Sequence, residues 1–121
     1  MSLTSGTHER ALTRKAGAAI LKGQALKKGA TDAEVIPAEL ATDVVIGVAG
    51  DAAASGETVP VLLLGGAGGT VQVLATGEIA VGDAVGVLGA AVAEGLHIGR
   101  AVEPAAAGEL CEVDPSTCAT L

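Results

Sequence analysis

The stretch that decides the fold is Ile46–Val61, which reads IGVAGDAAASGETVPV. It returns 52 residues later as Ile98–Val113, which reads IGRAVEPAAAGELCEV. Each copy has an Ile-Gly pair, a turn of small residues that ends in Gly-Glu, and an alternating apolar run. Neither copy carries side chains arranged for chemistry. We therefore interpret the stretch as a strand–turn–strand unit that the chain uses twice as β-architecture.

A second set of matches extends this repeat toward the N-terminus. Ile20 and Gly23 match Ile79 and Gly82 at a spacing of 59 residues. Because the later landmarks match at a spacing of 52, the first copy is longer by 7 residues (59 − 52). The extra length lies in Ala30–Asp43, which we expect to be a loop inserted in the first copy.

The repeat divides the chain into an arm, two related halves and a tail. Residues 1–16 are polar and lack a periodic apolar face, so we expect a flexible basic N-terminal arm. A single β domain covers 17–113, with halves 17–64 and 70–113 joined by the glycine-rich break Gly65–Gly69. Residues 114–121 form a C-terminal tail that we expect to fray.

The strand and turn pattern predicts the fold class. Short apolar runs alternate with glycine turns, and no long segment has a 3.6-residue period, so we expect an all-β fold with at most short helical turns. A small pseudo-duplicated β-barrel or sandwich with an extended N-terminal arm fits this pattern. Within it, the β-branched run Val44–Val48 is predicted to be a buried strand.

The composition points to an oligomer. The 121 residues include no Phe, Tyr or Trp and 18 glycines. A core without aromatic rings buries less area per residue, and glycine raises the entropy that folding must overcome. Small domains of this kind commonly draw stability from association, so we expect a homo-oligomer.

The charge is unevenly distributed along the chain. Residues 1–28 hold six of the seven basic side chains, although the whole chain has a net charge of −7. The acidic remainder would repel duplex nucleic acid, and the lack of aromatic rings excludes stacking platforms for single strands and aromatic-walled sugar sites. The basic segment fits a tether for an acidic partner surface or a soluble chain end, and charge alone does not separate these two interpretations.

The motifs that could carry chemistry have simpler structural explanations. Gly65–Gly69 does not resemble a phosphate loop, because Thr70 begins a strand-like alternation and no lysine follows Lys28. The carboxylates stand mostly at turns. Glu57 and Glu109 are repeat equivalents, so we expect both to bond local backbone.

The histidines and cysteines form no site that the sequence supports. His8 and His97 are isolated, and we expect His97 at the surface near a strand end. We prefer a small buried thiol at Cys111 to a disulfide with Cys118 or a metal site. The sequence therefore predicts no catalytic residue, no cofactor, no metal site and no enzyme. It shows no signal-peptide core and no apolar run near the ~20 residues that span a bilayer, so we expect a soluble protein made in the cytoplasm.

The order of these runs resembles a known family. Over about residues 17–113 this chain resembles the bacteriophage capsid cement, or head-decoration, proteins. The segments of the first half that carry the resemblance are Ile20–Leu26, Val35–Ala38, Ala41–Ala49, Ala52–Gly56 and Val59–Leu64. Ile79–Glu109 resembles the second half of the family's sequence. Lambdoid members carry a similar start of an apolar residue, two further residues and Gly-Gln, followed by an Ile/Val-Gly-Val stretch. This chain departs from the family in its lack of aromatic residues and in its cysteine-containing tail.

The resemblance implies a structural role on a virus particle. It implies a β-rich homotrimer bound to the major capsid protein on the outer surface of an icosahedral shell, where capsomers meet. There it would hold the expanded shell against internal DNA pressure, after synthesis in the host cytoplasm. No nucleic acid, membrane or small-molecule substrate is expected as a partner.

The resemblance also places the contact with the capsid in the N-terminal arm, which in such proteins becomes ordered on the shell. The residues expected to make it are Thr7, His8, Glu9, Arg10, Arg14 and Lys15. The alternative function is a small-molecule binding or carrier module with a barrel-sandwich fold, such as a biotinyl domain. That module needs a lysine at a hairpin tip, and a ligand at Gly65–Gly69 would favour it.

Overall fold

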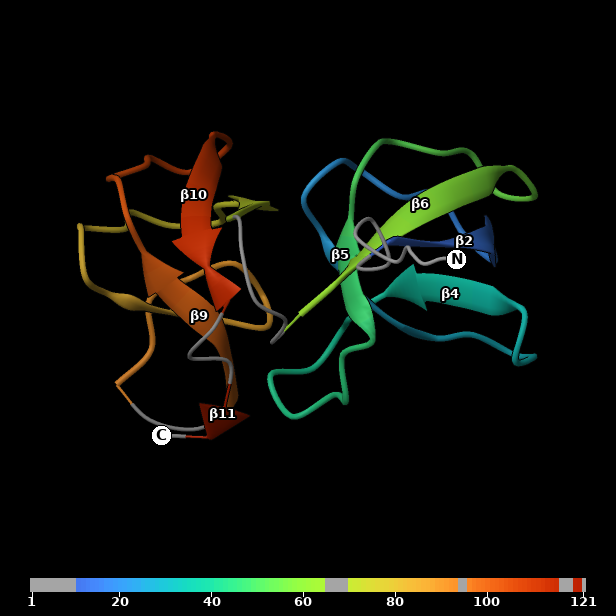
Figure 1. The fold of residues 1–121 in the computed structure, drawn as a ribbon, viewed down its shortest axis with the longest axis horizontal. Coiled ribbons are helices and arrows are strands. Elements are labelled where there is room, and N and C mark those ends of the chain that lie inside the picture. The colour runs from blue at the N-terminus through green and yellow to red at the C-terminus, as the bar shows by residue number, and fades with distance from the viewer. Residues whose placement is uncertain (1–10, 65–69, 94–95, 116–118, 121) are drawn as a thin grey trace, which may run out of the picture.

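The computed structural model describes residues 11–64, 70–93, 96–115 and 119–120, and within them the all-β class is confirmed. The strands form two lobes that lie side by side in Figure 1, one blue to green and one yellow to red. The first half contributes β2 (Ala11–Ala16), β3 (Ala25–Lys28), β4 (Glu34–Pro37), β5 (Gly47–Ala49) and β6 (Thr58–Leu63). The second half contributes β7 (Val71–Leu74), β8 (Ala84–Gly86), β9 (Leu96–Ala101), β10 (Leu110–Asp114) and β11 (Ala119–Thr120).

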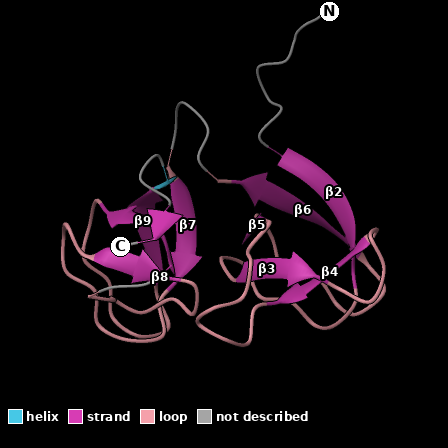
Figure 2. Ribbon diagram, turned by 90° about the horizontal axis from the view of Figure 1, so that it is seen from below, coloured by secondary structure: helices cyan, strands magenta, loops and turns pink. Residues whose placement is uncertain are grey.

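The first half is a closed barrel in the order β2-β4-β3-β5-β6. β2 closes it, because this strand pairs antiparallel with β6 and parallel with the start of β4. In β6 the apolar residues Val59 and Val61 are fully buried, whereas Thr58 and Pro60 are exposed. This alternation is what a strand with one face on a core requires. Figure 2 shows many of the connecting loops of both lobes gathered on one side of the molecule.

The second half repeats this arrangement with an open sheet. β10 pairs with β7 as β6 pairs with β2, and the order is β11-β9-β10-β7 with β8 attached to β9. The repeat holds at the level of single hydrogen bonds. Ile20 N donates to Ala53 O at 2.8 Å, and Ile79 N donates to Ala105 O at the same distance. The predicted duplication is therefore present in the backbone.

The turn carboxylates also repeat. Glu57 Oε1 accepts a hydrogen bond from Ala54 N at 2.7 Å, and Glu109 Oε1 accepts one from Ala106 N at 2.8 Å. Each carboxylate satisfies an amide in its own turn, which is the local role predicted from the sequence.

The extra residues of the first half lie between β3 and β5. Ala38 N donates to the carbonyl of the first residue of β3 at 2.8 Å, and Val92 N makes the same bond to β8 at 2.9 Å. Ala38 and Val92 are therefore equivalent positions. Most of the extra length before them forms the β3–β4 hairpin, which the second half replaces by a single bridge between Val85 and Ala91.

Two hydrophobic cores support the lobes, and one of them crosses between the lobes. The barrel core holds Ala16, Ile20, Leu26, Val35, Ala49, Ala53, Val59 and Val61. The second core is built on the second half, but it includes Ala25 and Val48 of the first half, with Leu62 packed against it. The lobes are therefore joined by shared apolar burial.

Three boundaries expected from the sequence need correction. Ala11–Ala16, predicted to belong to a flexible arm, is β2, and its backbone pairs on two sides. The segment from residue 114, predicted to fray, includes paired residues, because Asp114 ends β10 and Ala119–Thr120 pairs with β9. The predicted strand Val44–Val48 is also wrong at its start, because β5 begins at Gly47.

Candidate functional site

The predicted capsid-binding residues fall in two groups. Thr7, His8, Glu9 and Arg10 lie outside the described residues, as does the Gly65–Gly69 joint. Arg14 and Lys15 lie in β2, opposite Val59 and Thr58 of β6. The structure thus brings only these two predicted residues together, on a strand of the barrel rather than on a free arm.

Arg14 and Lys15 border a shallow hollow on the barrel surface. The hollow has a volume of about 420 Å³, and Asp32, Ala33 and Thr58 complete its lining with Thr13. Arg14 Nη1 donates a hydrogen bond to Thr13 O at 3.0 Å. Lys15 is exposed. Both cations are therefore at the surface and accessible to an acidic partner.

His97 is not the surface residue that the sequence predicted. Its exposed fraction is only 5%, because it lies in β9 between Gly86 of β8 and Ala119 of β11. Within the part of the chain that the structure describes, its Nδ1 has no hydrogen-bond partner. A strand that is central in its sheet buries positions that an end strand would expose, and β9 is central.

Cys111 is a buried free thiol, as the sequence predicted. Its Sγ donates to Glu103 O at 3.3 Å. Burial raises the pKa of the thiol, and the neighbouring charges of Glu103 and Glu112 raise it further. A protonated buried thiol is inert, so this residue has a packing role. Cys118 lies outside the described residues.

The described ranges contain no cluster of three or more His, Cys, Asp or Glu side chains that could hold a metal ion. Among the same residues, no helix is long and apolar enough to cross a membrane. The described surface includes the hollow beside β2, the junction between the halves and the 38–46 loop of the first half.

The junction between the halves depends on Gly23. Its carbonyl accepts a hydrogen bond from Leu74 N in β7 at 2.9 Å. Gly23 has a φ of +89°, and a Cβ on this residue would lie 2.6 Å from Leu74 N and 2.7 Å from Leu110 Cδ2. Its repeat equivalent, Gly82, has the same φ but faces open space. The turn at Gly23 therefore docks tightly on the second half, whereas a Cβ at Gly82 would meet no described atom within 4 Å.

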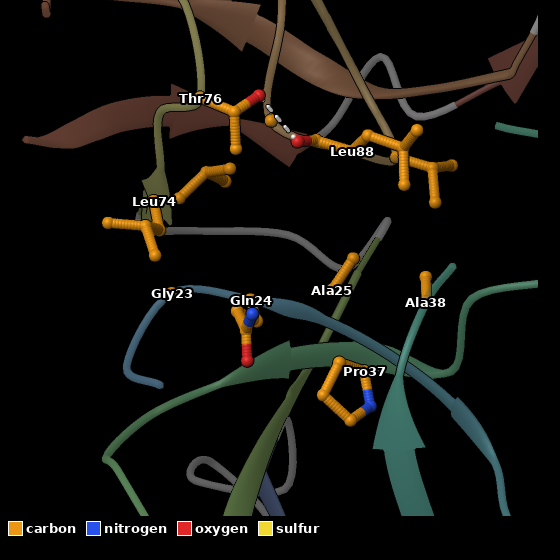
Figure 3. Close-up of a pocket in the computed structure, with 11 residues that line it drawn as sticks. Gly23, Gln24, Ala25, Pro37, Ala38, Leu74, Thr76 and Leu88 are labelled. Carbon is orange, nitrogen blue, oxygen red and sulfur yellow. Dashed lines mark hydrogen bonds between the residues drawn. The ribbon is translucent and has the colours of Figure 1, made fainter. Parts of the chain in front are cut away.

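A groove opens beside this junction, and we call it the inter-half groove. Its volume is about 370 Å³. Figure 3 shows Leu74 and Leu88 on one side of the space and Pro37 and Ala38 on the other. Leu88 is held at the rim by a hydrogen bond from Thr76 Oγ1 to its carbonyl at 2.8 Å. The remaining lining residues are Gly23, Gln24, Ala25, Val73, Val87 and Gly89.

The loop of residues 38–46 is the surface feature that the sequence reasoning missed. Leu40 is 61% exposed and Val44 is 83% exposed, whereas Val44 was predicted to be buried. The signal was the presence of large apolar residues in a segment that overlaps the predicted insertion Ala30–Asp43. A periodic β-branched pattern cannot show which end of the run leaves the sheet, so the run was read as one buried strand.

Asp43 braces this loop from inside. Its Oδ2 accepts hydrogen bonds from Glu39 N and Leu40 N, both at 2.9 Å. Lys27 Nζ lies 3.1 Å from the same oxygen and 3.2 Å from Glu39 Oε1. The amide bonds from Leu40 and Glu39, with Lys27, hold the pKa of Asp43 below its ordinary value.

Comparison with known proteins gives the fold a counterpart. No family model and no curated protein matches the sequence. Among solved structures, the chain is similar to the head fiber gp8.5 N base of bacteriophage phi29, with a TM-score of 0.71 and 24% sequence identity. The match covers 92% of this chain and 96% of that chain. The two-lobed β-architecture described above is therefore shared, nearly in full, with the base of a phage head fiber.

Proposed function

We propose that this chain is a structural virion protein that decorates and stabilises the outer surface of an icosahedral phage head. It acts as a homotrimer bound to the major capsid protein at capsomer junctions, and it is not an enzyme. The observation that carries the proposal is the fold, which matches a phage head fiber base over 92% of the chain. The sequence resemblance to head-decoration proteins supports the same role independently.

The chemistry of the described surface supports a binding role. The described residues offer a braced apolar loop, an apolar groove and a basic strand, and no metal-binding cluster. A protein that repeats over a shell needs only modest contacts, because many weak contacts on a lattice give large avidity. Small surface features of this kind are therefore sufficient for decoration.

The N-terminal segment is the proposed contact with the shell. Arg14 and Lys15 lie at the surface of β2, and the chain continues from that strand toward residues 1–10, which include Thr7, His8, Glu9 and Arg10. The cations Arg10, Arg14 and Lys15 near one end of the chain would attract an acidic capsid surface, and a protonated His8 would add a fourth. Such attraction weakens as salt screens it, so head binding should weaken with ionic strength.

A truncation tests this contact without disturbing the barrel. Deletion of residues 1–10 leaves β2 complete, and we expect it to abolish co-sedimentation with purified phage heads while the folded oligomer remains. In the full chain, the double variant Arg14→Gln, Lys15→Gln should weaken head binding more than the control double variant Lys22→Gln, Lys28→Gln. The control removes the same amount of charge at other positions. Undiminished head binding by the truncated chain would overturn the proposed role of the segment.

A further inference from the structure

We propose that the tip of the 38–46 loop, formed by Leu40 and Val44, docks into the inter-half groove of a second copy of this chain. The inference rests on the proposed function only in its oligomeric part. It names the surfaces through which copies join, and it leaves the contact with the capsid to the N-terminal segment.

The loop presents apolar side chains in a way that an isolated chain would not favour. Leu40 and Val44 are 61% and 83% exposed, and they share one short loop. Two hydrogen bonds and two ion pairs at Asp43 and Glu39 hold that loop in shape. A braced loop loses little conformational entropy when it binds, so its apolar tip is prepared for a partner.

The ends of the loop are fixed to the barrel. Ile46 N donates to Leu26 O at 2.8 Å, and Ala38 N donates to β3 at the same distance, so both ends of the loop are tied to one strand. In the second half, Val92 and Ile98 occupy the equivalent ends. Seven residues join the two ends in the first half and five join them in the second, so the loop of the first half is longer by 2 residues (7 − 5).

The inter-half groove is a receptor of the matching chemistry. Its lining contains no charged side chain, and Leu74, Leu88, Val87 and Pro37 make its walls aliphatic. Leu88 is 42% exposed at the rim although the backbone around it is fixed. A volume of about 370 Å³ is within the range of binding sites, about 300–1,000 Å³.

The position of the groove favours a second copy as the occupant. The groove is continuous with the interface that joins the two halves, because Ala25, Ala38 and Val73 belong both to its lining and to the shared core. Its lining also includes Ala38, the first residue of the loop. Every copy thus carries both tip and groove, so each copy can give a tip and receive one, and a ring forms where the rotation between copies closes, as it does in the proposed trimer.

A cross-linking experiment tests the contact directly. The background chain carries Cys111→Val, which copies the equivalent residue Val59, and Cys118→Ser. Chains with Val44→Cys and chains with Leu88→Cys are purified separately, mixed and oxidised mildly. We expect a disulfide-linked dimer between the two kinds of chain. Val81→Cys, which is 64% exposed outside the groove, replaces Val44→Cys in the control and should give about tenfold less. Equal yields from both mixtures would overturn the proposal.

A second experiment measures association and head binding separately. In light scattering, Leu40→Asp with Val44→Asp should weaken self-association by about tenfold or more, and Val81→Asp should leave it unchanged. A wild-type chain that binds heads but stays monomeric at every concentration would overturn the loop inference and the homotrimer, and head decoration would stand. If association depends on Leu40 and Val44 but the chain does not bind phage heads, the proposed function alone would be overturned.

Discussion

The two halves of this protein share one backbone plan but differ on one face. In the first half, Val48 pairs across the strands with Leu62, and both pack on the core of the second half. At the equivalent positions of the second half, Arg100 pairs with Asp114. Arg100 is exposed, and its Nη1 donates to Gly82 O at 3.2 Å. The apolar pair joins the first half to the second, and the charged pair occupies the equivalent place on the second half.

This difference makes the face of the second half polar where the equivalent face of the first half is apolar. Repeat proteins need polar residues on their terminal units, because an apolar stacking face left open would recruit further copies. Here the second half carries Arg100 and Asp114 on that face, with β11 added to the edge of β9. The self-association that we propose therefore uses another surface, the 38–46 loop and the inter-half groove.

The largest effect on stability should come from exchanging the residues at the equivalent positions 48 and 100. Val48 is fully buried between the halves, so Val48→Arg would bury a charge without a partner and cost about 3–5 kcal/mol of unfolding free energy. The reciprocal Arg100→Val changes an exposed residue and should stay within about 0.5 kcal/mol. Urea denaturation of both variants checks the contrast, and similar losses from the two would remove the distinction between the faces.

The next effect compares the two equivalent glycines. Both Gly23→Ala and Gly82→Ala place a side chain at φ of +89°, at a cost of about 1–2 kcal/mol. Only Gly23→Ala adds a collision with Leu74 N and Leu110, which should lower the free energy of unfolding by about 1–3 kcal/mol more. Thermal unfolding of the pair measures the difference. Equal melting temperatures would mean that the halves do not meet as described.

A smaller effect should be the same in both halves. Glu57→Ala and Glu109→Ala each remove the acceptor for one turn amide, and each should cost about 1 kcal/mol. The two turns are equivalent, so the two losses should agree within about 0.5 kcal/mol. Chemical denaturation of the single variants provides the test, and a loss confined to one of them would contradict the equivalence of the turns.

The smallest effect concerns the 38–46 loop, which is two residues longer than its equivalent, residues 92–98. Because the folded-state pKa of Asp43 is lowered from 3.8, its stabilising contribution is present above that value and is lost as the pH falls through the lower folded value. Carboxyl titration by NMR should give a midpoint for Asp43 below 3.8. A midpoint at or above 3.8 would show that the amides of Glu39 and Leu40 do not bind this carboxylate in solution.

Much of this fold could be predicted from the sequence because the repeat is visible in it. The landmarks Ile20, Gly23 and Gly56 align with Ile79, Gly82 and Gly108, and the structure gives both sets the same turns. The strand β2 was missed because the comparison stopped at residue 17. Carried further at the same spacing, Leu12 aligns with Val71 and Ala16 with Ala75, and the shared pattern would have revealed the strand.

The candidate site was less predictable because it depends on which faces meet. Val48 and Val44 look alike in the sequence, yet one is fully buried and the other is 83% exposed. The sequence places His97 near the end of a strand, but β11 pairs with β9 there and the residue is buried. Contacts between distant segments decide each of these cases, and local pattern carries no information about them.

Cryo-electron microscopy of phage heads incubated with the full chain tests whether this two-lobed protein decorates the outside of the head. We expect added density on the outer surface where capsomers meet, in groups of three two-lobed copies, with the β2 side of each copy toward the shell. Heads without added density, or with density only inside the shell, would contradict it.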